Sequence, residues 1–441
     1  MKWMRGLWAG ACLLLVLSGC SKDPTGTIKD AGAYSPIITG VAGDKEPAVR
    51  GVANSFTVLV TNVSGFPIAY HWSAGAGVLT DSTHATAVWD APNAIGTYPI
   101  TVSIVSDDGA GHTYFKTMTF QVFVDNEYTR WTRSPEVQFD PAPTQTGGVV
   151  YAQFRNIVTG AADAYNLAAA GGSPVKLTQD FLTLASPSLQ SDGQQLAFYS
   201  KRIPGDSVGI WLLPGTGGDP SMTTHVVSKS PYNFVPPANP IFARTGKWLL
   251  YNADSTTATN SKPWFRDCTD LAIPRQRVLA DGTENIGVFW QPAWGPDIDG
   301  NGLPDSVVCP GYYSFGSPAQ IALGLYKFAT TPEQTSAVPW LLDYDAKEVD
   351  WSPDGHHIIY AKRNSVTGDR DIWIINAASS DPGTAVRVTF GPADDSRPRF
   401  SADGSAILFI SNRADHYGLN GIFNTERRGT NIWGVTRFDR P

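Results

Sequence analysis

Short segments with alternating apolar and polar residues occur between positions 35 and 126. They predict strands over residues 55–61, 68–72, 85–89, 98–105 and 116–124. Turn-rich stretches with Gly, Asp and Asn separate the segments at roughly ten-residue intervals, a pattern typical of a β-sandwich. We therefore expect a sandwich domain over residues 35–126, with Trp72 in its core.

Two short motifs refine this expectation. Gly96-Thr97-Tyr98 precedes the fourth predicted strand, and Ser106-Asp107-Asp108-Gly109 follows it. Both motifs resemble those of the polycystic-kidney-disease (PKD) and immunoglobulin-like modules of bacterial surface proteins. The resemblance implies a spacer, with adhesion to a protein or carbohydrate as the alternative.

A second pattern repeats through residues 127–441. An apolar head, a turn of the Asp-Gly type and a buried strand recur, clearest at Trp351–Gly355 and Phe400–Gly404, weaker at Leu189–Gly193 and Phe242–Gly246, and divergent at Trp294 and Phe139. The heads are about 50 residues apart, and each unit has four strand signals. Repeats of this length and content are typical of β-propeller blades.

The ends of the repeat region predict how the propeller closes. The last repeat ends after its third strand, Asn431-Ile-Trp433, whereas Tyr128–Thr132 precedes the first repeat and matches the fourth-strand pattern. We expect this N-terminal segment to complete the last blade, which would remove an exposed sheet edge. The predicted fold is all-β: an immunoglobulin/PKD-like sandwich followed by a six-bladed propeller with an N-terminal closing strand.

The repeats resemble those of the TolB-type propeller family of the bacterial periplasm, most closely in the last two blades. The resemblance covers about 310 residues, but the N-terminal α/β domain of that family is replaced here by the predicted sandwich. We expect the repeated Trp211, Trp373 and Trp433 to pack between blades.

The first 34 residues read as a targeting segment. Residues 1–19 carry Lys2 and Arg5 followed by an apolar run, as in a signal peptide. The run ends in Leu17-Ser18-Gly19-Cys20, which resembles a bacterial lipobox. This resemblance implies that Cys20 is lipidated, that residues 20–34 form a tether, and that Ser21 directs the protein to the outer membrane. The membrane, reached through the lipid anchor, is thus one expected partner.

An oxygen-rich loop interrupts the fourth repeat. Its candidate ligands, at the spacing of a Ca²⁺-binding loop, are Asp297, Asp299, Asn301, Asp305 and the carbonyl of Leu303. Gly302 allows the sharp turn, while Val308 stands where an EF-hand has its bidentate Glu. The loop resembles the calcium loops of integrin-type FG-GAP repeats, which implies a structural Ca²⁺ ion. An acidic hairpin without metal is the alternative.

Enlarged loops suggest a binding face. The loops between the second and third strands of blades three, four and six are expected to be long, over 255–262, 311–320 and 414–429. Those of blades four and six carry aromatic and cationic residues that suit a binding surface: Tyr312, Tyr313, Phe315, His416, Tyr417, Arg427 and Arg428. Unselected variation of surface loops would produce the same pattern.

Net charge and the absence of known motifs exclude several classes of function. The net charge of −7 argues against nucleic-acid binding, which needs a basic surface. Motifs of hydrolases, nucleotide-binding loops and zinc sites are absent from the sequence. An oxidising envelope permits a disulfide between Cys268 and Cys309, although their strands are not adjacent in the repeat.

The sequence favours a non-catalytic, lipid-anchored cell-envelope protein whose propeller is a platform for a protein or glycan partner. The alternative is a propeller enzyme, a lyase or hydrolase, acting on polysaccharide or peptide. Four histidines fall in the propeller, at His225, His356, His357 and His416. Their predicted positions are scattered, which gives the enzyme alternative little support.

Overall fold

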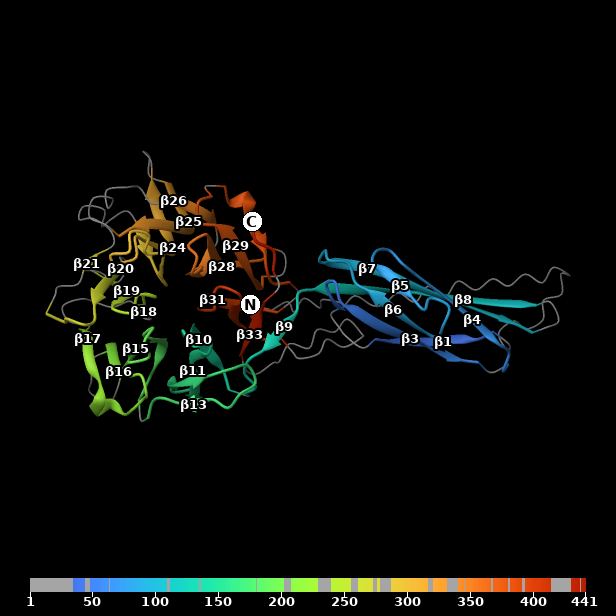
Figure 1. The fold of residues 1–441 in the computed structure, drawn as a ribbon, viewed down its shortest axis with the longest axis horizontal. Coiled ribbons are helices and arrows are strands. Elements are labelled where there is room, and N and C mark those ends of the chain that lie inside the picture. Colours follow the sequence, from blue (N-terminus) through green and yellow to red (C-terminus); the bar gives the residue numbers. More distant parts are fainter. Residues whose placement is uncertain are drawn as a thin grey trace, which may run out of the picture. The chain divides into compact units, whose positions relative to one another are not determined.

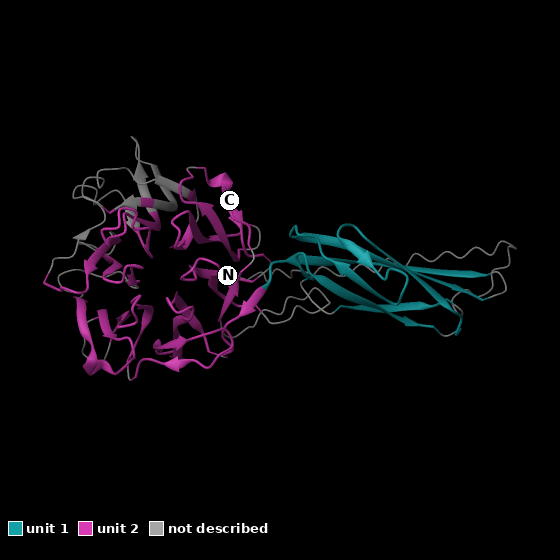
Figure 2. Cartoon of the chain, viewed as in Figure 1, with its two compact units in different colours: residues 1–127, 414–424 teal, residues 128–413, 425–441 magenta. Residues whose placement is uncertain are grey.

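The structure is a computed structural model in which two compact units are found, their described parts lying in residues 35–127 and 128–441 (Figure 2). The described residues are 35–43, 48–62, 64–108, 112–134, 136–179, 181–201, 208–228, 239–254, 261–272, 276–277, 287–315, 320–330, 340–344, 346–365, 368–379, 381–390, 393–413, 430–436 and 438–441. In these residues no helix is both long and apolar enough to cross a bilayer.

The first unit is a β-sandwich. One sheet has the order β1 (Ile37–Gly43), β3 (Ala53–Thr61), β6 (Thr86–Asp90), β5 (Val78–Thr80), and the other β2 (Ala48–Val49), β8 (Thr113–Asp125), β7 (Gly96–Asp107), β4 (Ile68–Ala74). Alternating residues of both sheets form one apolar core that includes Phe56, Trp72 and Trp89. Trp72 is buried, as its place in the strand pattern predicts.

The second unit contains, among its described residues, six antiparallel sheets arranged around a centre (Figure 1). The first three are β10 (Gln138–Pro143), β11 (Val149–Asn156), β12 (Ala161–Leu167), β13 (Val175–Lys176); β14 (Ala185–Leu189), β15 (Gln195–Ser200), β16 (Gly209–Pro214), β17 (Thr224–Ser228); and β18 (Ile241–Phe242), β19 (Trp248–Asp254), β20 (Ser261–Asp267), β21 (Gln276–Arg277). The fourth is β22 (Gly287–Phe289), β24 (Ser306–Phe315), β25 (Gln320–Ala329), β26 (Trp340–Tyr344), with β23 (Ala293–Trp294) also paired to β24. The last two are β27 (Ala346–Trp351), β28 (His357–Arg363), β29 (Arg370–Asn376), β30 (Val386–Arg387); and β31 (Asp395–Phe400), β32 (Ile407–Ser411), β33 (Asn431–Val435), β9 (Tyr128–Arg130).

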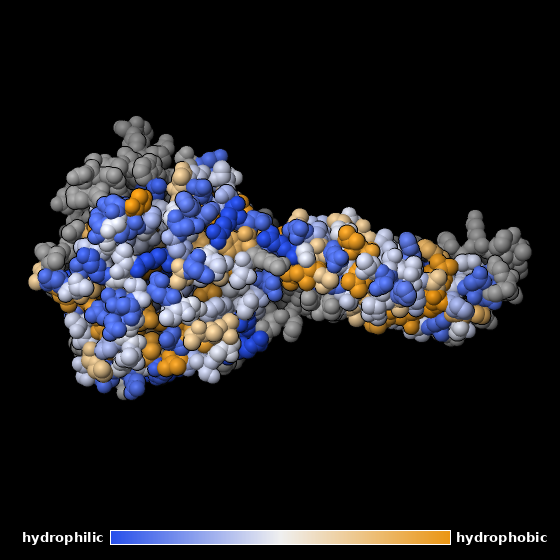
Figure 3. Space-filling view, viewed as in Figure 1, coloured by the Kyte–Doolittle hydropathy of each residue, from blue (hydrophilic) through white to orange (hydrophobic). Residues whose placement is uncertain are grey.

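Apolar layers fill the spaces between neighbouring sheets. Trp211 packs with residues of the first and second sheets, Trp373 borders the layer between the fourth and fifth, and Trp433 lies between the fifth and sixth. A further layer joins the sixth sheet to the first, through Leu408 and Tyr151 among others. The apolar packing therefore runs around the whole ring, and the fold is the predicted all-β propeller. On the face seen in Figure 3, hydrophilic residues are interspersed with smaller apolar areas.

Strand β9 closes the propeller in the predicted manner. It pairs antiparallel with β33, with Trp433 opposite Arg130 and Val435 opposite Tyr128. The backbone N–H of Trp131 continues the pairing by donating to the carbonyl of Ile432 at 2.8 Å. The last sheet is thus built from segments about 300 residues apart in sequence.

The structure corrects the position of one repeat. Phe139 was expected to head the first blade, but the turn that closes in the other blades at Gly193, Gly246, Gly355 and Gly404 closes here at Gly147, through the N–H of Gly147 and the carbonyl of Thr144. The equivalent head is therefore Pro143. The error arose because an aromatic residue was matched instead of the left-handed glycine that defines the turn.

Candidate functional site

Six polar residues, one from each blade, lie around the centre of the propeller with positive φ angles. We call them the channel ring: Asp140, Ser186, Asn239, Gln291, Glu348 and Arg397. Their φ values lie between 41° and 53°, and only Asp81 shares this property among the other non-glycine residues that are described. All six line one pocket. A side chain with Cβ pays on the order of 1 kcal/mol in this conformation, so its sixfold repetition marks a feature held in place by the rest of the fold.

Local breaks in the innermost strands create the ring. The pairing of β10 with β11 shifts between Phe139 and Ala142, and that of β31 with β32 shifts between Ser396 and Arg399. The second and fifth blades have the same irregularity, while Asn239 precedes β18 and Gln291 separates β22 from β23. Such bulges redirect a side chain out of the regular strand pattern. Here four such bulges, together with the strand start at Asn239 and the strand break at Gln291, direct six polar side chains toward the same pocket.

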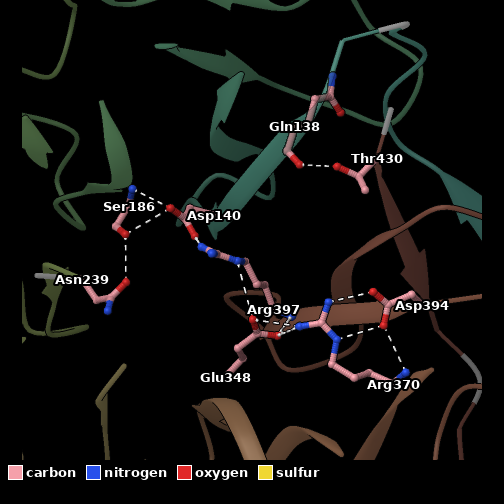
Figure 4. Close-up of polar contacts among 9 residues, drawn as sticks. All are labelled: Gln138, Asp140, Ser186, Asn239, Glu348, Arg370, Asp394, Arg397 and Thr430. Atoms are coloured by element: carbon pink, nitrogen blue, oxygen red, sulfur yellow. Dashed lines mark hydrogen bonds and ion pairs between the residues drawn. The ribbon is translucent and has the colours of Figure 1, made fainter. Parts of the chain in front are cut away.

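Hydrogen bonds connect the ring on the side of the first three blades (Figure 4). The backbone N–H of Ser186 donates to Asp140 Oδ2 at 2.8 Å, and Ser186 Oγ lies 3.1 Å from the same oxygen and 3.0 Å from Asn239 Oδ1. A hydroxyl has one proton, so Ser186 satisfies both contacts only if Asn239 presents its amide nitrogen instead. Ser186 then donates to Asp140 and accepts from Asn239.

Ion pairs continue the ring through the last two blades (Figure 4). The guanidinium of Arg397 pairs with Asp140, and its Nε lies 3.8 Å from Glu348 Oε1. Glu348 also accepts the backbone N–H of Arg397 at 2.9 Å and lies 3.3 Å from the guanidinium of Arg370. Arg370 forms a bidentate pair with Asp394 at 2.9 and 2.8 Å.

The electrostatics keep Arg397 and Asp394 charged at neutral pH. Burial, together with the nearby charge of Arg399, lowers the pKa of Arg397 to about 10, which still leaves it protonated. Burial raises the pKa of Asp394, but the hydrogen bonds and charge of Arg370 outweigh this effect and hold the pKa below its ordinary value. Both ring carboxylates, Asp140 and Glu348, therefore face a permanent cation.

The chemistry available to the channel ring is hydrogen bonding. Within the described residues, Gln291 is the one ring member whose side chain makes no hydrogen bond or ion pair. The pocket measures about 30 Å³, which is the space of one or two water-sized groups. The ring can thus receive the tip of a polar side chain, a chain terminus or a sugar hydroxyl, but no whole ligand.

The acidic loop predicted to bind Ca²⁺ joins β23 to β24. One carboxylate oxygen from each of Asp297, Asp299 and Asp305 lies within 4.8 Å of the others. Ligands on opposite sides of a Ca²⁺ ion are separated by about twice the usual 2.3–2.6 Å bond length, so this spacing fits such an ion. Asn301 and Leu303 belong to the same loop, in which the N–H of Leu303 donates to Asn301 Oδ1 at 2.7 Å.

The loop's own hydrogen bonds bring these oxygens together. Asp297 accepts the backbone N–H groups of Gly300 and Gly302, both at 2.9 Å, and Asp305 accepts that of Ile298 at 2.6 Å. Gly300 and Gly302 have φ values of 72° and 88°, a conformation that favours glycine. The loop is therefore curled around its carboxylates by local turns.

Only part of the predicted binding face lies among the described residues. Residues 414–429, with His416, Tyr417, Arg427 and Arg428, are outside the described residues, as is the predicted lipidation site Cys20. Tyr312, Tyr313 and Phe315 lie in strand β24, not in a loop. The expectation that these three residues lie in a loop was wrong because aromatic residues favour a strand, which here continues to Phe315 opposite Gln320.

The two propeller cysteines are free thiols, so the disulfide that the sequence permits between Cys268 and Cys309 is not formed. The reason is their placement: Cys268 packs in the apolar layer between the second and third blades, and Cys309 in the layer between the third and fourth. Burial raises the pKa of Cys268 to about 12 and also raises that of Cys309. Both thiols thus belong to the core.

A weak sequence signal for the channel ring was present but not used. In five of the six blades a proline follows the ring residue directly, as in Ser186-Pro187, Gln291-Pro292 and Arg397-Pro398. Each ring residue also stands three positions before the head of its repeat, counting Pro143 as the head of the first. Aligning the five repeats that have a glycine turn would have placed their polar residues in one column, and Gln291 joins this column when the fourth repeat is aligned by its head Trp294.

No family model matches the chain. One stretch of 93 residues is 33% identical to dipeptidyl-peptidase 5 of Porphyromonas gingivalis, covering 20% of this chain and 13% of that protein. The chain thus corresponds to a small part of the peptidase, and the match does not assign its activity.

Solved structures with a similar fold include TolB from Acinetobacter baumannii, with 14% identity, 83% of this chain and 80% of that chain covered, and a TM-score of 0.44. The β-propeller domain of the trilobed protease from Pyrococcus furiosus gives 11% identity, 63% and 77% coverage, and a TM-score of 0.38. Identities this low carry no information on activity. Fold and site together define an all-β protein with a propeller whose channel is ringed by polar side chains.

Proposed function

We propose that this protein is a non-catalytic, lipid-anchored protein of the bacterial cell envelope, whose propeller channel binds a protruding polar group of a protein or glycan partner. The observation that carries the proposal is the channel ring. Six side chains of different polar types converge in one pocket from six blades, each in a conformation that costs free energy. A fold tolerates such repeated strain most readily where the side chains serve a function.

The hydrogen-bonding pattern of the ring favours binding over catalysis. Asp140 accepts a hydrogen bond from the Ser186 hydroxyl, but its other carboxylate oxygen pairs with Arg397, and the positive charge of Arg397 stabilises the carboxylate and weakens it as a base for that hydroxyl. Of the described histidines in the propeller, His225 stacks on Trp211, His356 lies in the turn before β28 and His357 begins β28, and none of them lines the ring pocket. The ring offers fixed donors and acceptors instead.

The location in the envelope rests on the lipobox-like Leu17–Cys20 segment. A lipidated Cys20 would hold the chain at the membrane, and the sandwich would act as a PKD- or immunoglobulin-like spacer between the anchor and the propeller. The proposal therefore includes the membrane as one partner and an envelope protein or glycan as the other.

A structural Ca²⁺ ion in the fourth blade is part of the proposal. Asp297, Asp299 and Asp305 would supply carboxylate oxygens, and Asn301 and the Leu303 carbonyl would complete an oxygen-only ligand set of the FG-GAP type. The ion would offset two of the three negative charges of the clustered carboxylates and hold the turn between β23 and β24. The channel ring makes no use of it.

Capture experiments with ring variants test the binding role. Lipidated wild-type protein is crosslinked in native membranes and compared with Ser186→Ala and with Gln291→Ala. We expect both variants to recover less of the partner, because each removes a hydrogen-bonding group of the ring. As a matched control, Ser405→Ala removes a hydroxyl from an exposed turn of the sixth blade and should recover the partner fully. Equal recovery by all four proteins would contradict the proposal.

A further inference from the structure

A second pocket lies between the fifth and sixth blades, outside the channel ring. It measures about 360 Å³, within the range of small-molecule sites, and its lining is mostly polar. Three cationic side chains line it, Lys347, Arg363 and Arg370, together with the carboxylates of Asp369 and Asp394. Its size and lining distinguish it from the small ring pocket. The two pockets are linked by the ion pair between Arg370, which lines this pocket, and Glu348, which lines the ring pocket.

The three cations share one face of the fifth blade. Lys347 pairs with Ala361 across β27 and β28, and Arg363 pairs with Arg370 across β28 and β29. Residues that are paired across strands, or two apart along a strand, point to the same side of a sheet. The small Ala361 stands between the longer side chains, and it belongs to the apolar layer that faces the sixth blade. The pocket therefore lies at the outer edge of this apolar layer, and cationic side chains line it.

Like charges directly opposite each other destabilise a sheet unless an anion compensates them. Arg370 is compensated by Asp394 and Glu348. Within the described residues, Lys347 and Arg363 form no ion pair, and both are exposed. Arg363 acts on Asp394 from beyond ion-pair distance, so neither Arg363 nor Lys347 is bound to a carboxylate of the described residues, and both can contact a ligand at the wall of the pocket.

The acidic and amide groups of the pocket limit the chemical class of ligand that it can bind. The N–H of Asp394 donates to Asn412 Oδ1 at 2.9 Å, which orients the Asn412 amide nitrogen as a donor toward other groups. Asp369 adds an acceptor for hydroxyl groups, but its negative charge disfavours a doubly charged phosphate. A singly charged carboxylate that also carries hydroxyls satisfies every one of these groups.

We propose that this pocket binds the carboxylate and hydroxyls of an acidic sugar, with Lys347 and Arg363 on the carboxylate and Asp369 on the hydroxyls. Arg370, fixed between Asp394 and Glu348, forms the charged wall and positions the site. The inference does not depend on the channel ring binding a partner.

Titration calorimetry or ligand-observed NMR with the full mature chain tests the site, with D-glucuronate as the probe and D-glucose and glucose 6-phosphate as comparisons. We expect glucuronate to bind, and Lys347→Ala and Arg363→Ala each to weaken it by about tenfold, the loss of one charged hydrogen bond. Lys201→Ala, which removes an exposed lysine of the second blade, should leave the affinity unchanged.

Three outcomes would overturn the proposal: no glucuronate binding by the folded wild type, equal binding of glucose and glucuronate, or binding that persists in the double variant Lys347→Ala/Arg363→Ala. Preference for glucose 6-phosphate would reject the sugar acid as ligand. Both substituted side chains are exposed, so the variants should unfold at the wild-type urea midpoint.

Discussion

The buried ion pair that supports the closing strand gives the sharpest energetic prediction. Arg413 donates to Asp395 at 2.8 Å, with 1% and 0% of the two side chains exposed. The guanidinium carbon of Arg413 lies 3.7 Å from the ring centroid of Tyr128 on strand β9. Arg413→Ala therefore removes the partner of a buried carboxylate and a cation–π contact to the strand that closes the propeller.

Breaking a buried pair on one side costs about 3–5 kcal/mol, because the remaining charge stays in the protein interior. The propeller unit has about 300 residues, and at an unfolding entropy of about 2.1 cal/mol/K per residue a loss of about 3 kcal/mol lowers the unfolding midpoint by roughly 5 °C. Burial already raises the pKa of Asp395. Without Arg413 the pKa rises further, and a raised carboxyl pKa gives stability at low pH that is lost as the pH increases. The cost of Arg413→Ala should thus be larger at pH 8 than at pH 5, by at most about 1.4 kcal/mol per pH unit.

Urea unfolding followed by tryptophan fluorescence measures this cost. Arg155→Ala is the matched control, since Arg155 is 43% exposed and its partner Asp163 keeps an ion pair with Lys176 at 2.9 Å. It should cost less than about 1 kcal/mol. A cost below about 1 kcal/mol for Arg413→Ala at pH 8, or a cost independent of pH, would refute the reasoning.

Three further predictions concern single groups. Calcium should give a binding isotherm with the wild type and with Asp192→Ala, a turn aspartate of the second blade, but not with Asp299→Ala; identical titrations would argue against the Ca²⁺ loop. Burial raises the pKa of Asp371 to about 6, above its ordinary 3.8, so the folded chain holds a proton that the unfolded chain releases between these values. The free energy of unfolding should therefore fall by about 2 kcal/mol from pH 4 to pH 6, and Asp371→Asn should flatten this slope when urea unfolding is repeated across the range; equal slopes would count against it. Cys268 and Cys309 should react with a thiol reagent only after unfolding, because both are buried and their pKa values are raised, and rapid labelling of the native protein would disprove this.

Much of the fold follows from periodicity. Strands with a period of two, and turns about 50 residues apart, were sufficient to predict the all-β propeller and the pairing of β9 with β33, because the same local chemistry recurs in each blade. The boundaries of strands in irregular blades were harder to predict from the sequence. The fourth blade was expected to leave its strand at Gly311, but Tyr312 to Phe315 continue it, since aromatic residues fit a pleated surface well.

The channel ring could not be predicted from sequence periodicity. Its members differ in chemistry, from the carboxylate of Asp140 to the amide of Gln291, so no repeated residue type marks them. What they share is a backbone conformation and a position before the repeat head. A positive φ at a non-glycine residue arises from the surrounding bulge, which depends on how the neighbouring strands pair. The acidic loop, by contrast, was visible because its ligands are close together in sequence.

The central claim is that a polar group of the partner enters the channel ring. Its most direct test is the affinity of a captured partner for Gln291→Trp, since an indole cannot share a pocket of about 30 Å³ with an incoming group. Val158→Trp, at a side chain that is 91% exposed in the first blade, is the control, and both variants should match the wild type in urea unfolding. We predict that Gln291→Trp weakens the partner's binding at least tenfold while Val158→Trp leaves it unchanged. Wild-type affinity in Gln291→Trp would contradict the account.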